Sequence, residues 1–175
     1  MEFQITLAEE EDYQAIVDTI ESVVDSLEEK EWFAADSAEY ILQILKEGTG
    51  IGFKATEALS GRLAGIFMMV FPGRSEENLG RDLGFPDQEL EKVVHMDTVA
   101  VLPEFRGHHL QSRLMRAAEE EAARRGYRYL MCTVHPENRY SRENVLKQGY
   151  RAVLTKEKYG GYLRDILVKT LDESN

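Results

Sequence analysis

Apolar residues recur at strand spacing and then at helical spacing in the first part of the chain. Alternation over Phe3–Leu7 predicts a first strand. An apolar stripe over Tyr13–Leu27, with acidic residues on the other face, predicts a helix. A second helix is expected to open at Asp36, whose spacing to Glu39 is that of a capping box, and to stop at Gly48. The chain therefore begins as a strand followed by two helices.

The middle of the chain is predicted to form three consecutive strands, near 51–57, 62–71 and 93–101. The second of these is apolar on both faces and too short for a helix, which favours a central strand. Between the second and third strands lies a polar, glycine-containing segment at 73–92. Because long loops in compact domains are often functional, two interpretations stay open. The segment is either a surface excursion with a short helix at 87–92 or a flap over a substrate site.

The last part of the chain alternates helices and strands. The whole order, β-α-α-β-β-β-α-β-α-β-β, describes a mixed α/β sheet with helices on both faces. We expect one domain over 1–175. In the helix expected at about 107–125, Glu120 with Arg124 and Glu121 with Arg125 have the spacing of surface ion pairs. The elements expected here are a helix at about 107–125, a strand at 127–134, a helix at 138–148, and strands at 150–157 and 161–170.

Composition narrows the functional class. Hydrophobic residues make up 43% and charged residues 30%, as in a soluble globular protein. No apolar run approaches the roughly 20 residues that span a bilayer, and the N-terminus lacks the basic and apolar regions of a signal peptide. We therefore expect a cytoplasmic protein without a membrane partner. The single cysteine, Cys132, lies among apolar residues of a predicted strand, which favours a buried thiol over a nucleophile.

The formal net charge of -11 bears on possible partners. It argues against nucleic acid, whose phosphates would be repelled. It is compatible with a cationic substrate such as an amine, which the field of the protein would attract. The same charge also serves solubility, so it does not identify a substrate.

The strand, loop and helix at 93–125 carry the most informative chemistry. A helix N-terminus exposes backbone N–H groups and a partial positive charge, and it therefore binds phosphate. Arg106 and Gly107 stand at the start of the predicted helix, where Arg106 can add a cation for a pyrophosphate. Many α/β proteins share these features, so this spacing alone is weak evidence.

Two passages resemble the GNAT superfamily of acyl-CoA-dependent N-acetyltransferases. The first, Val99–Met115, reads VAVLPEFRGHHLQSRLM and is similar to motif A, in which R-G-x-G-x-G/A joins a strand to a helix. The second, Asn138–Tyr150, reads NRYSRENVLKQGY and is similar to motif B. The resemblance implies transfer of an acetyl group from acetyl-CoA to a primary amine of a small molecule or peptide, without a metal, by a monomer or a homodimer. The alternatives are a non-catalytic acyl-CoA-binding or sensor module, and an interaction domain that has lost CoA binding.

The resemblance also implies where the cofactor lies. The strands at 93–101 and 127–134 are expected to splay apart in a V, so that pantetheine pairs with the backbone of Val99 and Val101. The pyrophosphate is expected on the backbone amides of 107–112, and Asn138 and Asn144 are expected to contact the cofactor. Asn138 also suits a helix N-cap. The residues implied in the phosphate turn are Arg106, Gly107, His108, His109, Leu110, Gln111 and Ser112.

The sequence departs from the family pattern at three positions. His109 and Gln111 replace glycines that let backbone approach phosphate closely, so their side chains must turn away from the ligand or contact it. Val145 stands where many members carry the tyrosine that protonates the departing thiolate. A thiolate needs such help less than an alkoxide does, because the pKa of a thiol is about 8.5. The sequence does not rank three substitute acids: Tyr140, Tyr159 and Tyr162.

A base is also needed, because an alkylamine with a pKa of about 10.4 is mostly protonated at neutral pH. Position 95 corresponds approximately to a general-base glutamate of some family members, and here it is His95. Asp97 follows on the same face of the strand. His95 is either a base or a hydrogen-bonded core histidine. Asp97 is either a base or an anchor for the substrate's ammonium group.

Overall fold

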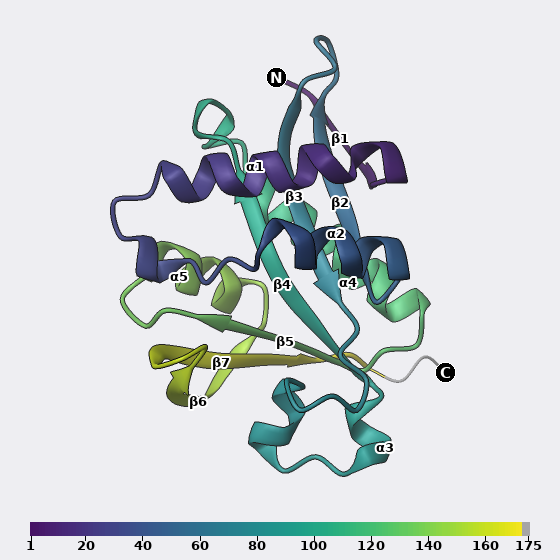
Figure 1. Cartoon of the computed structure of the whole chain (residues 1–175), viewed down its shortest axis with the longest axis vertical. Coiled ribbons are helices and arrows are strands. Elements are labelled where there is room, and N and C mark those ends of the chain that lie inside the picture. Colours follow the sequence, from purple (N-terminus) through teal and green to yellow (C-terminus); the bar gives the residue numbers. More distant parts are fainter. Residues whose placement is uncertain (173–175) are drawn as a thin grey trace. The chain divides into compact units, whose positions relative to one another are not determined.

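The computed structural model describes residues 1–172 and shows a mixed α/β fold (Figure 1). Its seven strands follow the order β1-β2-β3-β4-β5-β7-β6, with β4 and β5 parallel and the other registered pairs antiparallel. The expected mixed sheet is therefore confirmed. No helix within 1–172 is long and apolar enough to cross a membrane. The chain forms two compact units, of which the first comprises Met1–Lys30, Ala35–Val70 and Asp97–Ala118, and the second Glu31–Ala34, Phe71–Met96 and the chain from Glu119 onward.

In the first unit, α1 (Tyr13–Asp25) and α2 (Ala38–Glu47) lie on one face of a strand ladder (Figure 1). Their apolar stripes are buried, as the periodicity predicts. The ladder consists of β1 (Phe3–Leu7), β2 (Gly50–Glu57) and β3 (Leu63–Val70). The expected cap at Asp36 is wrong: Ser37 caps α2, and its Oγ accepts the N–H of Tyr40 at 3.2 Å. A short side chain one residue later reaches this amide with N-cap geometry.

The strand β3 is buried along almost its whole length, as expected of a central strand. Each residue from Ala64 to Met69 is buried. At Gly65, a Cβ would come within 2.9 Å of the carbonyl oxygen of Ala100, so glycine lets this part of β3 approach the chain near Ala100 closely. The Leu102 N–H also donates to the Ala64 carbonyl at 2.9 Å. This close pairing fixes the end of β4 (Val93–Val101) within the first unit.

In the second unit, β5 (Tyr129–Val134), β7 (Tyr162–Thr170) and β6 (Arg151–Lys158) form an antiparallel ladder. The parallel register between β4 and β5 covers only Val93–His95 against Tyr129–Met131. The last three residues of β5 therefore lie beyond its registered pairing with β4. Helix α5 (Arg139–Lys147) follows β5.

The segment 73–92 is a folded excursion within the second unit. It contains a 3-10 helix, η3 (Leu79–Leu83), and one short helix, α3 (Asp87–Leu90), close to the helix expected at 87–92. The buried Asn78 organises it, because Nδ2 donates to the carbonyls of Gly73 at 2.6 Å and Leu90 at 3.0 Å. Its Oδ1 accepts the N–H of Gly80 at 2.8 Å. The apolar side of the excursion joins a buried cluster of Leu79, Val93, Met131, Ile166 and Val168.

Helix α4 (Leu110–Arg124) ends in a charge cluster that differs from the expected pairs. Arg124 binds Glu121 rather than Glu120, with Nη2 2.5 Å from Oε1. Arg125 binds the same carboxylate, as expected, with Nε at 2.7 Å from Oε1. The hydrogen bonds from Arg124 and Arg125 outweigh burial and lower the pKa of Glu121 to about 2. One carboxylate thus serves two guanidinium groups, which simple spacing rules do not foresee.

Candidate functional site

The turn at 106–112 lies in the first unit and has the backbone of an anion site. The expected helix start at 107 is wrong, because Gly107 has φ 84° and His109 has φ 57°, and neither conformation continues a right-handed helix. A 3-10 turn, η4 (Pro103–Phe105), precedes them, and α4 begins at Leu110. The first helical bond runs from the Arg113 N–H to the His109 carbonyl at 3.1 Å. The amides of 110–112 therefore have no partner within the helix and can bind an anion.

His109 takes a left-handed backbone conformation at a position where the family motif has glycine. Histidine is among the residues that tolerate this region better, but the conformation still costs free energy relative to glycine. The His109 side chain is exposed, so the turn stays open although the glycine of the motif is missing. The Ser112 Oγ donates to the His109 carbonyl at 2.9 Å, which holds the same turn from its helical side.

The turn is also tied to the first strand. The His108 ring packs against Phe3 with 5.2 Å between ring centroids, and Phe3 makes an edge contact with Phe105 at 5.9 Å. Arg113 donates through Nη2 to the Phe3 carbonyl at 2.9 Å. His108 is thus committed to packing, whereas Arg106 stays exposed at the mouth of the turn. These contacts hold the backbone amides in place before any ligand binds.

The second half of β4 carries the other expected residues of the first unit. Val99 and Val101 are half-buried on either side of the buried Ala100. Asp97 is exposed, and its Oδ2 accepts a hydrogen bond from the Thr98 hydroxyl at 2.9 Å. An exposed carboxylate at this position can meet a cationic group from solvent.

His95 lies in the second unit and is engaged by the excursion. Its Nε2 accepts the backbone N–H of Leu79 at 3.1 Å. Burial lowers the pKa of His95 to about 4, Lys158 lowers it further by repulsion, and Asp82 opposes them. The imidazole is therefore neutral near pH 7 with its acceptor nitrogen in use. This arrangement favours the interpretation as a hydrogen-bonded core histidine.

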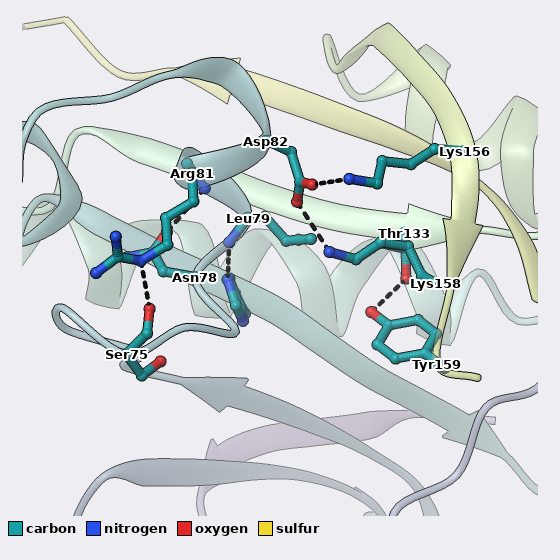
Figure 2. Close-up of polar contacts among 11 residues, drawn as sticks. Ser75, Asn78, Leu79, Arg81, Asp82, Thr133, Lys156, Lys158 and Tyr159 are labelled. Atoms are coloured by element: carbon teal, nitrogen blue, oxygen red, sulfur yellow. Dashed lines mark hydrogen bonds and ion pairs between the residues drawn. The ribbon is translucent and has the colours of Figure 1, made fainter. Parts of the chain in front are cut away.

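Asp82 joins η3 to β6 in the same unit (Figure 2). Its Oδ2 lies 2.9 Å from the Lys158 Nζ, and its Oδ1 is bound by Lys156. Burial alone would raise the pKa of Asp82, but the hydrogen bonds from Lys156 and Lys158 outweigh it and lower the pKa below its usual value. Arg81 donates to the backbone carbonyls of Ser75 at 2.8 Å and Arg74 at 2.6 Å, so η3 is also tied to the start of the excursion.

The three candidate tyrosines occupy different environments. Tyr140 on α5 is 74% exposed. Tyr162 lies beneath the guanidinium of Arg164, which is 5.4 Å from the ring centroid. The Tyr159 Oη lies 3.0 Å from the Thr133 Oγ1 on β5 (Figure 2). Hence, of the three, Tyr159 is the one whose hydroxyl the structure brings to the end of β5.

Helix α5 and strand β5 show the remaining predicted residues. Asn138 caps α5, as expected, since its Oδ1 accepts the Ser141 N–H at 3.2 Å. Asn144 is half-buried on the same helix, and Val145 is buried. The buried-thiol interpretation of Cys132 is confirmed, because the residue is buried, and this burial raises its pKa to about 12. A thiol with this pKa is not a nucleophile at neutral pH.

Sequence analysis did not identify two neighbouring charged residues of β7. Asp165 is buried and binds the Arg142 Nε at 2.7 Å and Thr155 Oγ1 at 2.5 Å. Arg164 is 2% exposed and donates through Nη2 to the Glu31 carbonyl at 2.5 Å. An Arg-Asp pair inside an apolar strand is the signal that would have flagged them, because buried charges need partners. By contrast, no local pattern reveals the contacts of Asp82.

The structure of residues 1–172 brings together no group of three or more His, Cys, Asp or Glu side chains that could hold a metal ion. A hollow of about 270 Å³ lies between α1 and α2, but none of the residues that line it belongs to the 106–112 turn. In the first unit, the candidate site is therefore the anion-binding turn, and this hollow is separate from it.

Comparison with known families shows to which family the chain belongs. The model of the Acetyltransferase (GNAT) family matches residues 7–150. The chain belongs to this family. No curated protein matches its sequence. The turn at 106–112 and the cap at Asn138 are thus elements of a GNAT domain.

Solved structures with this GNAT fold share little sequence identity with the chain. An acetyltransferase of the GNAT family from Streptococcus pneumoniae is 18% identical with a TM-score of 0.73, covering 97% of this chain and 100% of that one. A putative acetyltransferase from Salmonella typhimurium, solved with its cofactor acetyl-CoA, is 17% identical with a TM-score of 0.71, covering 100% and 97%. A ribosomal-protein-alanine N-acetyltransferase from Brucella melitensis is 21% identical with a TM-score of 0.71, covering 96% and 99%. These likenesses support the fold.

Proposed function

We propose that the protein transfers an acetyl group from acetyl-CoA to a primary amine of a small molecule or peptide by direct attack of the amine. The observation that carries this proposal is the turn at 106–112 in a GNAT chain. Left-handed backbone at Gly107 and His109 delays the helix start, so the amides of 110–112 precede the first helical bond. This is the arrangement that a pyrophosphate requires.

The cofactor is assigned to the residues that the resemblance to the family implies. Arg106 and the amides of 110–112 bind the pyrophosphate through charge-assisted hydrogen bonds. The backbones of Val99 and Val101 pair with the pantetheine arm, as an added strand would. Asn138 and Asn144 contact the cofactor from α5. The capping role of Asn138 does not conflict with this, since Nδ2 remains available while Oδ1 caps the helix.

The acceptor amine is assigned to Asp97. Its exposed carboxylate attracts an ammonium group, and either Asp97 or water then removes the proton before attack. His95 is the weaker candidate for a base, because its Nε2 already accepts the Leu79 N–H and its pKa is about 4. The neutral amine attacks the thioester carbonyl, and the thiolate leaves with the electron pair of the C–S bond. Hydroxylated substrates are poorer acceptors, because an alcohol is a weaker nucleophile than an amine at neutral pH.

The proposal is tested by CoA affinity and by release of free thiol from acetyl-CoA over a panel of polyamines, amino acids, aminoglycosides and peptides. We expect Arg106→Glu to weaken CoA binding by well over tenfold, about 1.4 kcal/mol, because it places a negative charge at the pyrophosphate. Arg116→Glu makes the same charge change at an exposed position further along α4 and should leave the affinity nearly unchanged.

The outcomes separate the alternatives. Unchanged CoA affinity in a folded Arg106→Glu variant would contradict the placement of the cofactor. CoA binding by the wild type with no thiol release on any amine would favour a sensor module, for which the buried Val145 gives a reason. If Val145→Tyr then gained turnover, the tyrosine would be shown to be essential after all.

A further inference from the structure

The hollow between α1 and α2 in the first unit is not used by the proposed function (Figure 1). It has a volume of about 270 Å³ and is lined by residues of α1, of α2 and of the chain at 35–36 shortly before α2. Its floor is apolar, because Val17, Ile20 and Ile41 line it and belong to the buried core. A cavity of about 150 Å³ is enough for a benzene-sized group, so this hollow has room for a leucine or phenylalanine side chain.

The rim of the hollow is acidic. Glu21 and Asp25 are exposed on α1, and Asp36 lines the hollow from the chain before α2. None of the nine described residues that line it is basic. Within residues 1–172, the carboxylates of Glu21 and Asp25 are engaged in no hydrogen bond or ion pair. An occupant of the hollow therefore meets an apolar floor and negative charge at the edge.

The carboxylates on α1 form an acidic stripe that the helix itself does not compensate. The stripe consists of Asp18, Glu21 and Asp25, which are spaced by three and four residues and so share one exposed face over about 10 Å of the helix. Like charges at this spacing repel each other. Asp25 also stands at the C-terminus of α1, where the helix dipole is negative, and the last turn holds no basic residue. A positively charged partner would relieve both effects.

The sequence concentrates its negative charge around this hollow. Of the 32 Asp and Glu residues of the chain, 13 lie among the first 40 positions, together with a single basic residue, Lys30. The other 19 acidic residues are balanced by 20 basic ones. The formal charge of -11 is therefore a property of the N-terminal segment rather than of the whole chain. Charge that is segregated in this way draws a cationic partner to one face of the protein.

The shape of the charge favours a peptide over a small amine. A primary amine carries one positive charge, whereas the acidic stripe extends over about 10 Å. A polyamine carries charges over such a length but has no side group for the apolar floor. A peptide segment with Lys or Arg on both sides of a large apolar residue supplies both features, because the apolar side chain leaves water while the cations stay at the exposed rim.

We propose that the hollow between α1 and α2 docks a cationic peptide segment of a partner protein. One large apolar side chain of the segment fills the hollow, and its Lys or Arg residues lie against the acidic stripe. The hollow and the stripe belong to the first unit, so the inference needs no residue of the second. It also does not depend on the proposed acetyl transfer. Exposed ion pairs contribute little free energy each and are screened by salt, so the apolar side chain supplies the larger part of the affinity.

The first test uses a short synthetic peptide with a leucine between arginines, acetylated at its N-terminus and amidated at its C-terminus. Because this peptide has no primary amine, it is not an acceptor for acetyl transfer. Titration calorimetry at low salt should show binding to the wild type. The double variant Glu21→Gln, Asp25→Asn should bind about threefold to tenfold more weakly, since two exposed charge pairs are lost. Equal affinity of this variant and the wild type would overturn the inference.

A charge-matched control is the double variant Glu76→Gln, Glu77→Gln. It removes the same charge from an exposed stretch of the other unit and should bind the peptide as the wild type does. If it bound as weakly as the Glu21→Gln, Asp25→Asn variant, the effect would come from net charge alone, and the assignment to the hollow would be wrong.

The second test separates docking of a peptide from unspecific attraction of cations. Replacing the peptide's leucine with serine should weaken binding to the wild type about tenfold. Ala38→Leu adds side-chain atoms at the wall of the hollow without changing its charge and should remove most of this preference. Equal binding of the two peptides, displacement of the leucine peptide by an equal concentration of spermine, or no binding at all would overturn the inference. Release of thiol from acetyl-CoA plays no part in these measurements, so the proposed function is tested separately.

Discussion

At the scale of single residues, His109 shows how a departure from a motif is accommodated. The family motif has glycine at this position, and here a histidine takes left-handed backbone with φ 57°. Its side chain is exposed. The motif therefore constrains the backbone at this position more strongly than the residue type.

This reasoning predicts the effect of substitutions at His109. His109→Gly should leave the free energy of unfolding unchanged or raise it by up to about 1 kcal/mol, because relief of backbone strain is partly offset by a more flexible unfolded chain. His109→Val should lower it by about 1–2 kcal/mol, since a β-branched residue is disfavoured in this region. Urea unfolding measures both. A His109→Val variant as stable as the wild type would mean that the turn relaxes to another conformation.

His95 gives a pH prediction at the same scale. Its folded-state pKa of about 4 lies below the ordinary value of 6.5, so the unfolded chain binds more protons between these values. Stability is therefore full above pH 6.5 and falls as the pH drops toward 4. We expect wild type to lose about 2 kcal/mol more than His95→Gln between pH 7 and pH 5.

Urea unfolding of the two proteins at both pH values checks this prediction, with His109→Gln as a surface histidine control that should follow the wild type. Equal pH dependence in wild type and His95→Gln would contradict it. The same pKa has a kinetic consequence. An acidic limb of the rate profile that belongs to His95 would fall near pH 4 rather than near 6.5.

At the scale of elements, the sequence predicted strands and helices well and their starts less well. Alternation located β1, and the two-sided apolar run located β3, because those signals are local. The start of α4 was placed three residues early, since the left-handed backbone at His109 is unusual for a residue other than glycine. The cap of α2 was misplaced by one residue, as Asp36 and Ser37 have similar capping preferences.

The excursion at 73–92 shows why part of the site escaped sequence analysis. Its order depends on contacts of Asn78 within the segment and of Asp82 with Lys156 and Lys158, which are more than seventy residues away. Residue 159 was one of three tyrosines of equal standing, and only its distance to Thr133 separates it from the others. By contrast, the proposal of a phosphate turn at 106–112 came from the resemblance to the family.

The link between η3 and β6 predicts a further effect. Asp82→Asn should lower the free energy of unfolding by about 1–2 kcal/mol, because it leaves the half-buried Lys158 and the exposed Lys156 without their nearly buried carboxylate. Arg74→Ala removes exposed ion pairs to Glu91 and Asp87 and should change stability by less than about 1 kcal/mol.

Hydrogen exchange locates the effect of Asp82→Asn. Protection should fall in η3 and in the β6–β7 hairpin and should be retained in β2 and β3, which belong to the other unit. If protection in the hairpin stayed at the wild-type level, the carboxylate would not be what holds η3 to β6. Because a protonated carboxyl cannot hold two lysines, the lowered pKa of Asp82 also means that this stabilisation is lost only as the pH falls below the usual aspartate range.

At the scale of the whole molecule, the proposed function pairs an acidic protein with an anionic cosubstrate, acetyl-CoA. The formal charge of -11 repels CoA at a distance, so the local donors at 106–112 must supply the attraction at contact. The same charge draws a cationic amine toward the protein. The fold class could be predicted because local sequence patterns give the order of the helices and strands. The acceptor substrate could not be predicted, because net charge does not describe the shape or chemistry of a binding pocket.

The burial of Cys132 has a practical consequence for studying this chain. It is the single cysteine of the sequence, and its high pKa keeps it unreactive toward thiol reagents while the protein is folded. In a test of the proposed activity, a colourimetric thiol reagent will therefore report released CoA with no background from the folded protein. A cysteine introduced at an exposed position, such as Glu157 on the β6–β7 hairpin, could carry a fluorophore without first removing the natural one. The hairpin next to Tyr159 can thus be followed in solution on an otherwise unmodified protein.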